Sequence, residues 1–117
     1  MAFKFENLKV WQRSLEFTLE IDRLIKKFPD NEKFALSSQM KRAGDSISLN
    51  IAEGSTGQSN KEFARFLGIS LRSGIEVVGC LHIGKKRGIV PEEDFLRMYN
   101  ELEEIIKMIQ ALRNSLK

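Results

Sequence analysis

Eight basic residues in the middle of the chain have the charge and the spacing that suit a nucleic-acid contact. They are Lys41, Arg42, Lys61, Arg65, Arg72, Lys85, Lys86 and Arg87. Lys61 and Arg65 are four residues apart and share one face of a helix, and Arg72 returns close to that face. Basic side chains gathered on one surface attract phosphates and release counterions. The pattern predicts a basic surface for RNA or DNA.

The charge of the chain is unevenly distributed around these residues. The formal net charge is +3, and residues 59–90 carry six lysines or arginines against two acidic residues. Residues 91–117 carry four basic residues against six acidic ones. The alternative interpretation is an ordinary solvated face, and the run Lys85–Arg87 also suits the negative end of a helix dipole. A ring of several copies would repeat the basic patch, and avidity would then strengthen weak contacts.

The residue types that most enzymes need are scarce. The chain has one histidine, His82, and one cysteine, Cys80, which point in different directions on a helix. One chain therefore offers neither a tetrahedral zinc set nor a cysteine–histidine pair with an orienting third group. The segment Gly68–Arg72 lacks the last glycine of a nucleophile elbow. Glu76 is interpreted as an ion-pair partner, and we expect no catalytic residue, no metal and no cofactor.

The polar segment Gly54–Asn60 superficially resembles a loop that cradles an anion ahead of a helix. A phosphate could bind at such a helix N-terminus. No strand is predicted before it and no Gly-Lys-Ser/Thr ending follows, so the nucleotide-binding motifs are absent. We interpret the segment as a turn. Gly54 ends one helix as a left-handed cap, and Ser59 begins the next in a capping box with Glu62.

Apolar residues recur at helical spacing along almost the whole chain. The clearest seam alternates spacings of three and four residues: Phe95, Met98, Leu102, Ile105, Ile109, Leu112 and Leu116. The two prolines, Pro29 and Pro91, fall between such segments. Helices are expected over about residues 8–28, 32–53, 59–86 and 91–114. Their short connections predict an all-α, antiparallel, up-down-up-down four-helix bundle that forms one domain over residues 1–117.

Polar residues occupy positions that an ordinary bundle would fill with apolar ones. Asn50 lies on or beside the apolar face of the second expected helix, with Ser46 one turn before it and Glu53 one turn after it. A buried asparagine can fix the register or the oligomer geometry of packed helices. We interpret Asn50, Ser46 and Glu53 as one structural network. A contact to a ligand or partner is the alternative.

The first and third expected helices have more apolar residues than one core needs. The first helix has one ridge at Leu8, Trp11, Leu15 and Leu19, and a second ridge at Phe17, Ile21, Leu24 and Phe28. The third helix is apolar nearly all round. A symmetric partner is the usual way to bury such a surplus, so we expect a homo-oligomer.

Length and composition favour a cytoplasmic protein. The N-terminal residues lack the apolar core of a signal peptide, and no uninterrupted run approaches eighteen apolar residues. A single cysteine cannot form an intrachain disulfide, which favours a reducing compartment. We expect no membrane association.

A series of short motifs gives the chain a family resemblance. In chain order they are Leu8–Gln12 with Trp11, Phe28-Pro29, Gln39 with Arg42-Ala43, Ser46-Ile47, Asn50–Gly54 and Glu62–Leu67. Together they resemble the four-helix-bundle proteins encoded in intervening sequences of bacterial large-subunit ribosomal RNA genes. The accessory variability proteins of diversity-generating retroelements are similar to this family. The chain departs from the pattern at Gly44-Asp45, where small apolar residues are usual, and at Arg72, where glycine is usual.

The resemblance implies a four-helix bundle that assembles as a ring, commonly a pentamer. For the retroelement branch it also implies binding to a reverse transcriptase and to nucleic acid through a basic surface. For most of the family no activity is assigned.

Two functions fit the sequence. The first is a non-enzymatic homo-oligomer whose basic surface binds RNA, DNA or a nucleoprotein partner. The second is a structural or adaptor protein that scaffolds a protein partner, with the charge serving only solubility. An enzyme would need ionisable groups from two or more subunits to converge in one pocket.

Overall fold

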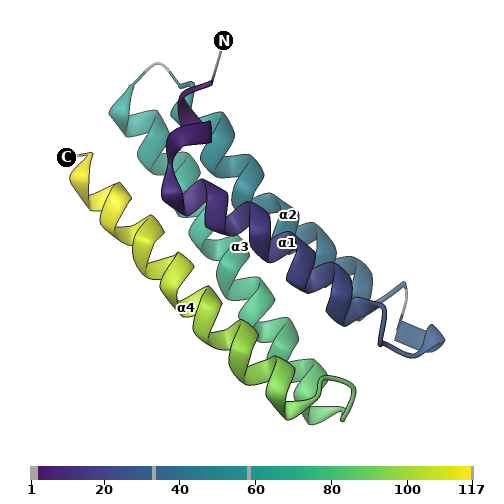
Figure 1. Ribbon diagram of the computed structural model, residues 1–117. Coiled ribbons are helices and arrows are strands. Elements are labelled where there is room, and N and C mark those ends of the chain that lie inside the picture. The colour runs from purple at the N-terminus through teal and green to yellow at the C-terminus, as the bar shows by residue number, and fades with distance from the viewer. Residues whose placement is uncertain (1–2, 33, 58, 117) are drawn as a thin grey trace.

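Four long helices make up most of the molecule. The computed structural model describes residues 3–32, 34–57 and 59–116. The helices are α1 (Lys9–Ile25), α2 (Leu36–Ser55), α3 (Asn60–Lys86) and α4 (Glu92–Ser115), and the short 3-10 helices η1 (Lys4–Asn7) and η2 (Asp30–Glu32) precede α1 and α2 (Figure 1). No strand occurs within the described ranges, and the all-α prediction is confirmed.

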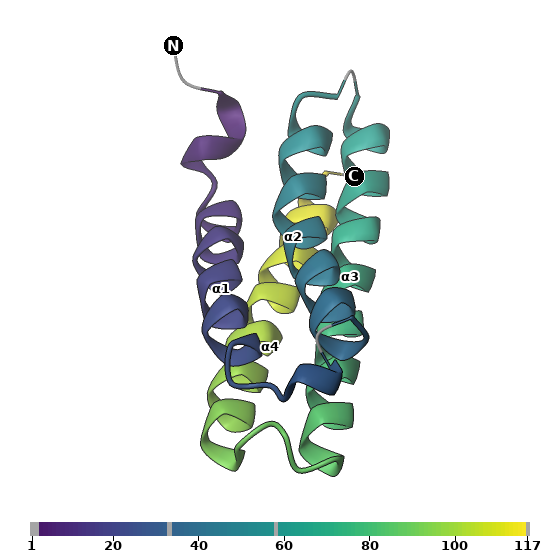
Figure 2. The same ribbon diagram turned by 90° about the vertical axis from the view of Figure 1, so that its right-hand side faces the viewer.

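The helices run up and down in alternation around a shared core. In both views the two chain ends and the α2–α3 connection lie at one end of the bundle, and the other two connections lie at the opposite end (Figures 1 and 2). Each helix contacts its two neighbours in the order α1, α2, α3, α4 and back to α1. The α2–α3 contact is the most extensive of the four and the α1–α4 contact the least. The predicted antiparallel bundle is confirmed.

The core is built from one apolar face of each helix. The seam predicted on α4 is buried from Phe95 to Ile109, and the second ridge of the first expected helix is buried from Phe17 to Phe28. On α3 the fully buried residues Leu67 and Leu81 face the same core. The helices associate because these stripes leave water together.

The α1–α2 connection differs from the sequence prediction. The helix expected to reach residue 28 ends at Ile25, and the next begins at Leu36. The amides of Lys27 and Phe28 bond the carbonyls of Leu24 and Ile25, which tightens the chain into a turn. The following Pro29 disfavours the helical conformation of Phe28, so the helix stops before the proline. Residue 33 lies outside the described residues.

Gly54 was expected to end α2 in a left-handed conformation, and this expectation is wrong. The helix continues to Ser55, and within the described residues only Gly88 has a positive φ. A Cβ at Gly54 would lie 2.6 Å from the Cβ of Phe66 and 3.0 Å from Cδ1 of Phe63. Glycine is therefore needed here because α2 and α3 approach each other closely.

Gly44 has a similar packing role on the other side of α2. A Cβ at this position would clash with Cδ1 of Ile21. The residue that departs from the family pattern therefore gives α1 room against α2.

α3 is long and apolar enough by composition to cross a membrane, the one such helix found in the described part of the chain. A core helix of a helical bundle passes the same test, and α3 packs along both α2 and α4.

Candidate nucleic-acid interface

Four basic side chains meet on the face shared by α3 and α4. Arg65 and Arg72 of α3 and Arg113 of α4 line a surface hollow of about 350 Å³ together with Gly68. A second hollow of about 500 Å³ is lined by Lys61, Arg65 and Arg113, and also by Glu62 with Ser59 and Ala64. Arg65 and Arg113 belong to both hollows. Lys61, Arg65, Arg72 and Arg113 are called the cationic face below.

Gly68 allows Arg113 to lie against α3. A Cβ at Gly68 would be 3.3 Å from Nη2 of Arg113 and 3.4 Å from its Cζ. An added methyl group would touch the guanidinium and require it to shift by a few tenths of an ångström, and a longer side chain would require more. The glycine therefore leaves room for a cation of α4 beside the cations of α3.

The cationic face keeps its charge. Within the described residues none of its four members forms an ion pair, and the Arg65 guanidinium instead lies 4.7 Å from the ring centroid of Phe66. Guanidinium groups without an acidic partner are the preferred donors to phosphate oxygens. The arrangement can hold polyanions by charge and by hydrogen bonding.

The run Lys85–Arg87 lies at the other end of α3, about 30 Å from Arg65 along the helix axis. Two of its three charges are paired, Lys85 with Glu92 at 3.2 Å and Arg87 with Glu32 at 3.3 Å. Lys86 is exposed. This run has less unpaired charge than the cationic face, because two of its three side chains form ion pairs.

Lys41 and Arg42 are not part of the cationic face. Lys41 Nζ lies 3.0 Å from Oδ1 of Asp22, where it joins α2 to α1. Arg42 lines a different hollow of about 440 Å³ between α2 and α3, beside Gln39 and Glu76. The eight basic residues singled out in the sequence therefore occupy four places, and of these residues only Lys61, Arg65 and Arg72 lie on the cationic face.

Arg113 is the member of the cationic face that sequence reasoning missed. It lies in the last turn of a helix whose charge is mainly acidic, and nothing in its spacing marks it. Only the alignment of α4 beside α3 shows that it reaches Gly68.

A polar network joins α2 to α3 inside the bundle. The hydroxyl oxygens of Ser46 and Ser73 are 2.8 Å apart, and Nδ2 of Asn50 donates to the Ser46 carbonyl at 2.8 Å and to its hydroxyl at 2.9 Å. Ser73 in turn donates to the carbonyl of Ile69 at 3.0 Å. Satisfied hydrogen bonds of this kind fix helix register. The sequence did not indicate Ser73 as a partner.

Glu53 does not belong to this network, contrary to expectation. Its side chain is exposed and makes no hydrogen bond or ion pair in the described part of the chain, while its backbone carbonyl accepts bonds from the amide and hydroxyl of Thr56. Glu53 follows the exposed Leu49 by four residues, so it lies on the solvent side of α2.

Gln39 and Trp11 also have structural contacts. Nε2 of Gln39 donates to Oε2 of Glu76 at 3.3 Å. Glu76, which was expected to form an ion pair, is exposed and accepts this amide bond instead. Trp11 is half-buried, with its ring edge-on to Phe5 at 4.8 Å between centroids.

The α2–α3 turn caps a helix. The hydroxyl of Ser59 accepts a hydrogen bond from the Glu62 amide at 3.1 Å, as an N-cap residue does. Gln58, part of the loop that resembles an anion cradle, lies outside the described residues.

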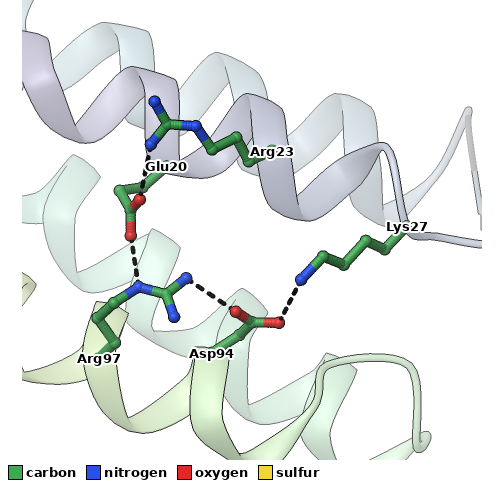
Figure 3. Close-up of polar contacts among 5 residues, drawn as sticks. All are labelled: Glu20, Arg23, Lys27, Asp94 and Arg97. Carbon is green, nitrogen blue, oxygen red and sulfur yellow. Dashed lines mark hydrogen bonds and ion pairs between the residues drawn. The ribbon is translucent and has the colours of Figure 1, made fainter.

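An ion-pair network holds α1 against α4 (Figure 3). The buried Asp94 carboxylate accepts bonds from Lys27 Nζ at 3.0 Å and from Arg97 Nη2 at 2.8 Å. Arg97 Nε also donates to Glu20 Oε2 at 2.7 Å, and Arg23 lies 3.1 Å from the same carboxylate. Burial opposes the ionisation of Asp94, but the bonds from Arg97 and Lys27 outweigh it and lower its pKa. The hydrogen bond from Arg97 is the main cause of the lowered pKa of Glu20.

The described residues give little support to nucleophilic or metal-dependent catalysis. Burial raises the pKa of the Cys80 thiol, and nearby Glu76 raises it further, so the thiol is a poor nucleophile. Among the residues that the structure describes, no group of three or more histidine, cysteine, aspartate or glutamate side chains is placed to hold a metal ion.

The fold and the cationic face together define a class of protein. It is a small antiparallel four-helix bundle in which basic side chains of two helices share one face and form no ion pairs among the described residues. The chain belongs to the family of the 23S rRNA-intervening sequence protein, whose model matches residues 6–111. It is similar to a protein of unknown function from the S23 ribosomal protein family of Bacteroides thetaiotaomicron VPI-5482, known from a crystal structure. That similarity has 30% identity and a TM-score of 0.83, and it covers 90% of this chain and 95% of the other. No curated protein matches the chain.

Proposed function

We propose that the protein is a non-enzymatic, cytoplasmic, homo-oligomeric binding protein whose cationic face binds RNA or DNA. The single observation that supports this most is the meeting of Lys61, Arg65, Arg72 and Arg113 on one face without acidic partners among the described residues. A nucleic-acid backbone is a common cellular ligand whose repeated phosphates can bind several unpaired cationic side chains at once.

Self-association is the second part of the proposal. Leu15 and Leu19 of α1 are 45% and 46% exposed, and Leu49 of α2 is 61% exposed. α1 lies diagonally across the bundle from α3, so a contact through these leucines leaves the cationic face open. A closed ring, with the pentamer as its expected form, would present one cationic face per copy and raise the affinity through avidity.

A reverse transcriptase or another nucleoprotein is the partner expected for such a ring. The resemblance to retroelement accessory proteins supports this step, and the cationic face would then bind the nucleic acid that the partner carries.

The test is a binding titration with a labelled RNA and a labelled DNA of mixed sequence at about 50 and 200 mM salt. Binding through phosphates predicts a loss of affinity as salt rises, steeper with more contacts. The Arg65→Glu variant should weaken binding to every sequence alike, because phosphate contacts carry no base information. Absence of binding at high micromolar protein in low salt would refute the proposal.

An adaptor protein without nucleic-acid binding is the second candidate. The observation in its favour is the number of exposed apolar side chains. Among those of the described residues, Phe34 is the most exposed, at 95%. A pull-down that recovers one protein, unchanged by nuclease treatment, would support the adaptor.

A further inference from the structure

The face shared by α3 and α4 becomes apolar beyond the cationic face. A hollow of about 310 Å³ is lined by Ile75, Val78, Tyr99, Glu103, Ile106 and Lys107. Ile75 is 55% exposed although it lies in the middle of the longest helix. Ile75, Val78, Tyr99 and Ile106 are called the apolar strip.

An aromatic cluster follows the apolar strip along the same face. The rings of His82, Phe95 and Tyr99 lie 5.0 to 6.1 Å apart between centroids. His82 is exposed, Tyr99 is half-buried, and Lys85 Nζ lies 4.4 Å from the Phe95 centroid. Flat, partly exposed rings offer a stacking surface to a ligand.

These features form one continuous path. α4 runs antiparallel beside α3, with Arg113 at Gly68, Ile106 at Gly74 and Tyr99 near His82. Arg65 and His82 are seventeen residues apart on α3, which is about 26 Å along the helix. Cations, an apolar strip and aromatic rings therefore follow each other on one side of the bundle.

We infer that this path binds nucleic acid as a single strand, with phosphates on the cationic face and bases on the apolar strip and the rings of Tyr99 and His82. This inference rests on the nucleic-acid binding proposed above. A single strand exposes the faces of its bases, which stack on aromatic side chains whatever the sequence. A stacked strand advances about 3.4 Å per nucleotide, so the path holds at most about eight nucleotides.

A duplex fits the same path poorly. Its bases are stacked inside, and a rigid rod lying on the cationic face would set a charged backbone over Ile75 and Ile106. The apolar strip would then lose water without gaining base contacts. An apolar segment of protein is the other occupant that such a strip can take, and the experiment separates the two.

The experiment measures fluorescence anisotropy with a twelve-nucleotide single strand and with a hairpin duplex that contains the same sequence. The full chain should bind the single strand at least about tenfold more tightly. His82→Leu and Tyr99→Leu each remove the ring and put a branched apolar side chain in its place. Each should weaken single-strand binding roughly tenfold and leave duplex binding unchanged. The exposed His82 is the safer variant for folding, and circular dichroism checks both.

Arg65→Glu is the comparison variant, because it should weaken single-strand and duplex binding together. Equal affinity for the two forms, or ring variants that bind the single strand like the unmodified chain, would overturn the single-strand inference and leave the proposed function standing. Failure of both nucleic acids to bind would overturn both. Ring variants that change the mass in light scattering would show that the strip is a contact between copies, and the inference would fall.

Discussion

The carboxylate of Asp94, in the first turn of α4, accepts a hydrogen bond from Lys27 Nζ at 3.0 Å, just beyond the end of α1. The bond crosses the least extensive helix contact of the bundle. Asp94 is 6% exposed, and its second partner, Arg97, extends the network to Glu20 of α1. Polar bonds thus strengthen α1–α4 where apolar packing is weakest.

Asp94→Asn should destabilise the fold by about 1–3 kcal/mol at pH 7, because Lys27 and Arg97 lose their shared anion. The folded-state pKa of Asp94 is lowered, so its contribution is present above the unfolded value of about 3.9 and is lost as pH falls through the folded value. The difference between the two proteins should therefore shrink at about pH 3. Urea unfolding followed by circular dichroism at both pH values measures it, and an equal difference at both would contradict the ionic role.

Gly54→Ala should destabilise the bundle by about 1–2 kcal/mol. Its Cβ would meet the Cβ of Phe66, an atom fixed to the backbone of α3, and the strain exceeds the gain in helix propensity. Gly79→Ala is the matched control on α3, because nothing lies within 4 Å of the added Cβ. The control should stabilise by up to about 1 kcal/mol. Thermal or urea unfolding of both variants measures the change in the free energy of unfolding. A change of the same sign in both would show that the close approach of α2 and α3 at Gly54 does not limit the side chain there.

Much of the fold follows from the sequence because each helix carries its own period. The spacing from Phe95 to Ile109 defines one buried stripe without reference to any other helix. The same reasoning from local spacing gave the wrong role to Gly54. In the sequence, a glycine that permits close contact between helices cannot be distinguished from a glycine that ends a helix. The distinction depends on Phe66, which lies on another helix.

The candidate site was only partly predictable for the same reason. Lys61 and Arg65 share a face by spacing alone, but Arg113 joins them only through the alignment of α4 with Gly68. In the sequence Lys41 looked equivalent to Lys61 and Arg65. It is paired with Asp22 on another helix, and the spacing of residues does not reveal such a contact. Charge is visible in a sequence, whereas its neutralisation is not.

Arg113→Glu tests the residue that only the structure revealed. If Arg113 contacts phosphate, the variant should bind RNA and DNA roughly tenfold more weakly and reduce the salt slope by about 1. Lys9→Glu makes the same charge change at the exposed start of α1, where glutamate suits the helix dipole. Anisotropy titrations at several salt concentrations compare the two. Equal losses in both variants would mean that only net charge matters and that the cationic face has no special role.

Leu15→Glu combined with Leu19→Glu should convert the assembly to monomers. These two leucines are about half exposed, and each glutamate would place a charge without a partner in an apolar contact between copies. The helix itself should persist, because both positions face away from the buried ridge of Phe17 and Ile21. Light scattering should give several times 13.4 kDa for the unmodified chain and about one chain for the variant. Lys9→Glu is again the control and should keep the larger mass. A monomeric unmodified chain at micromolar concentration would rule out the homo-oligomer, and an unchanged mass in the double variant would place its contact away from α1.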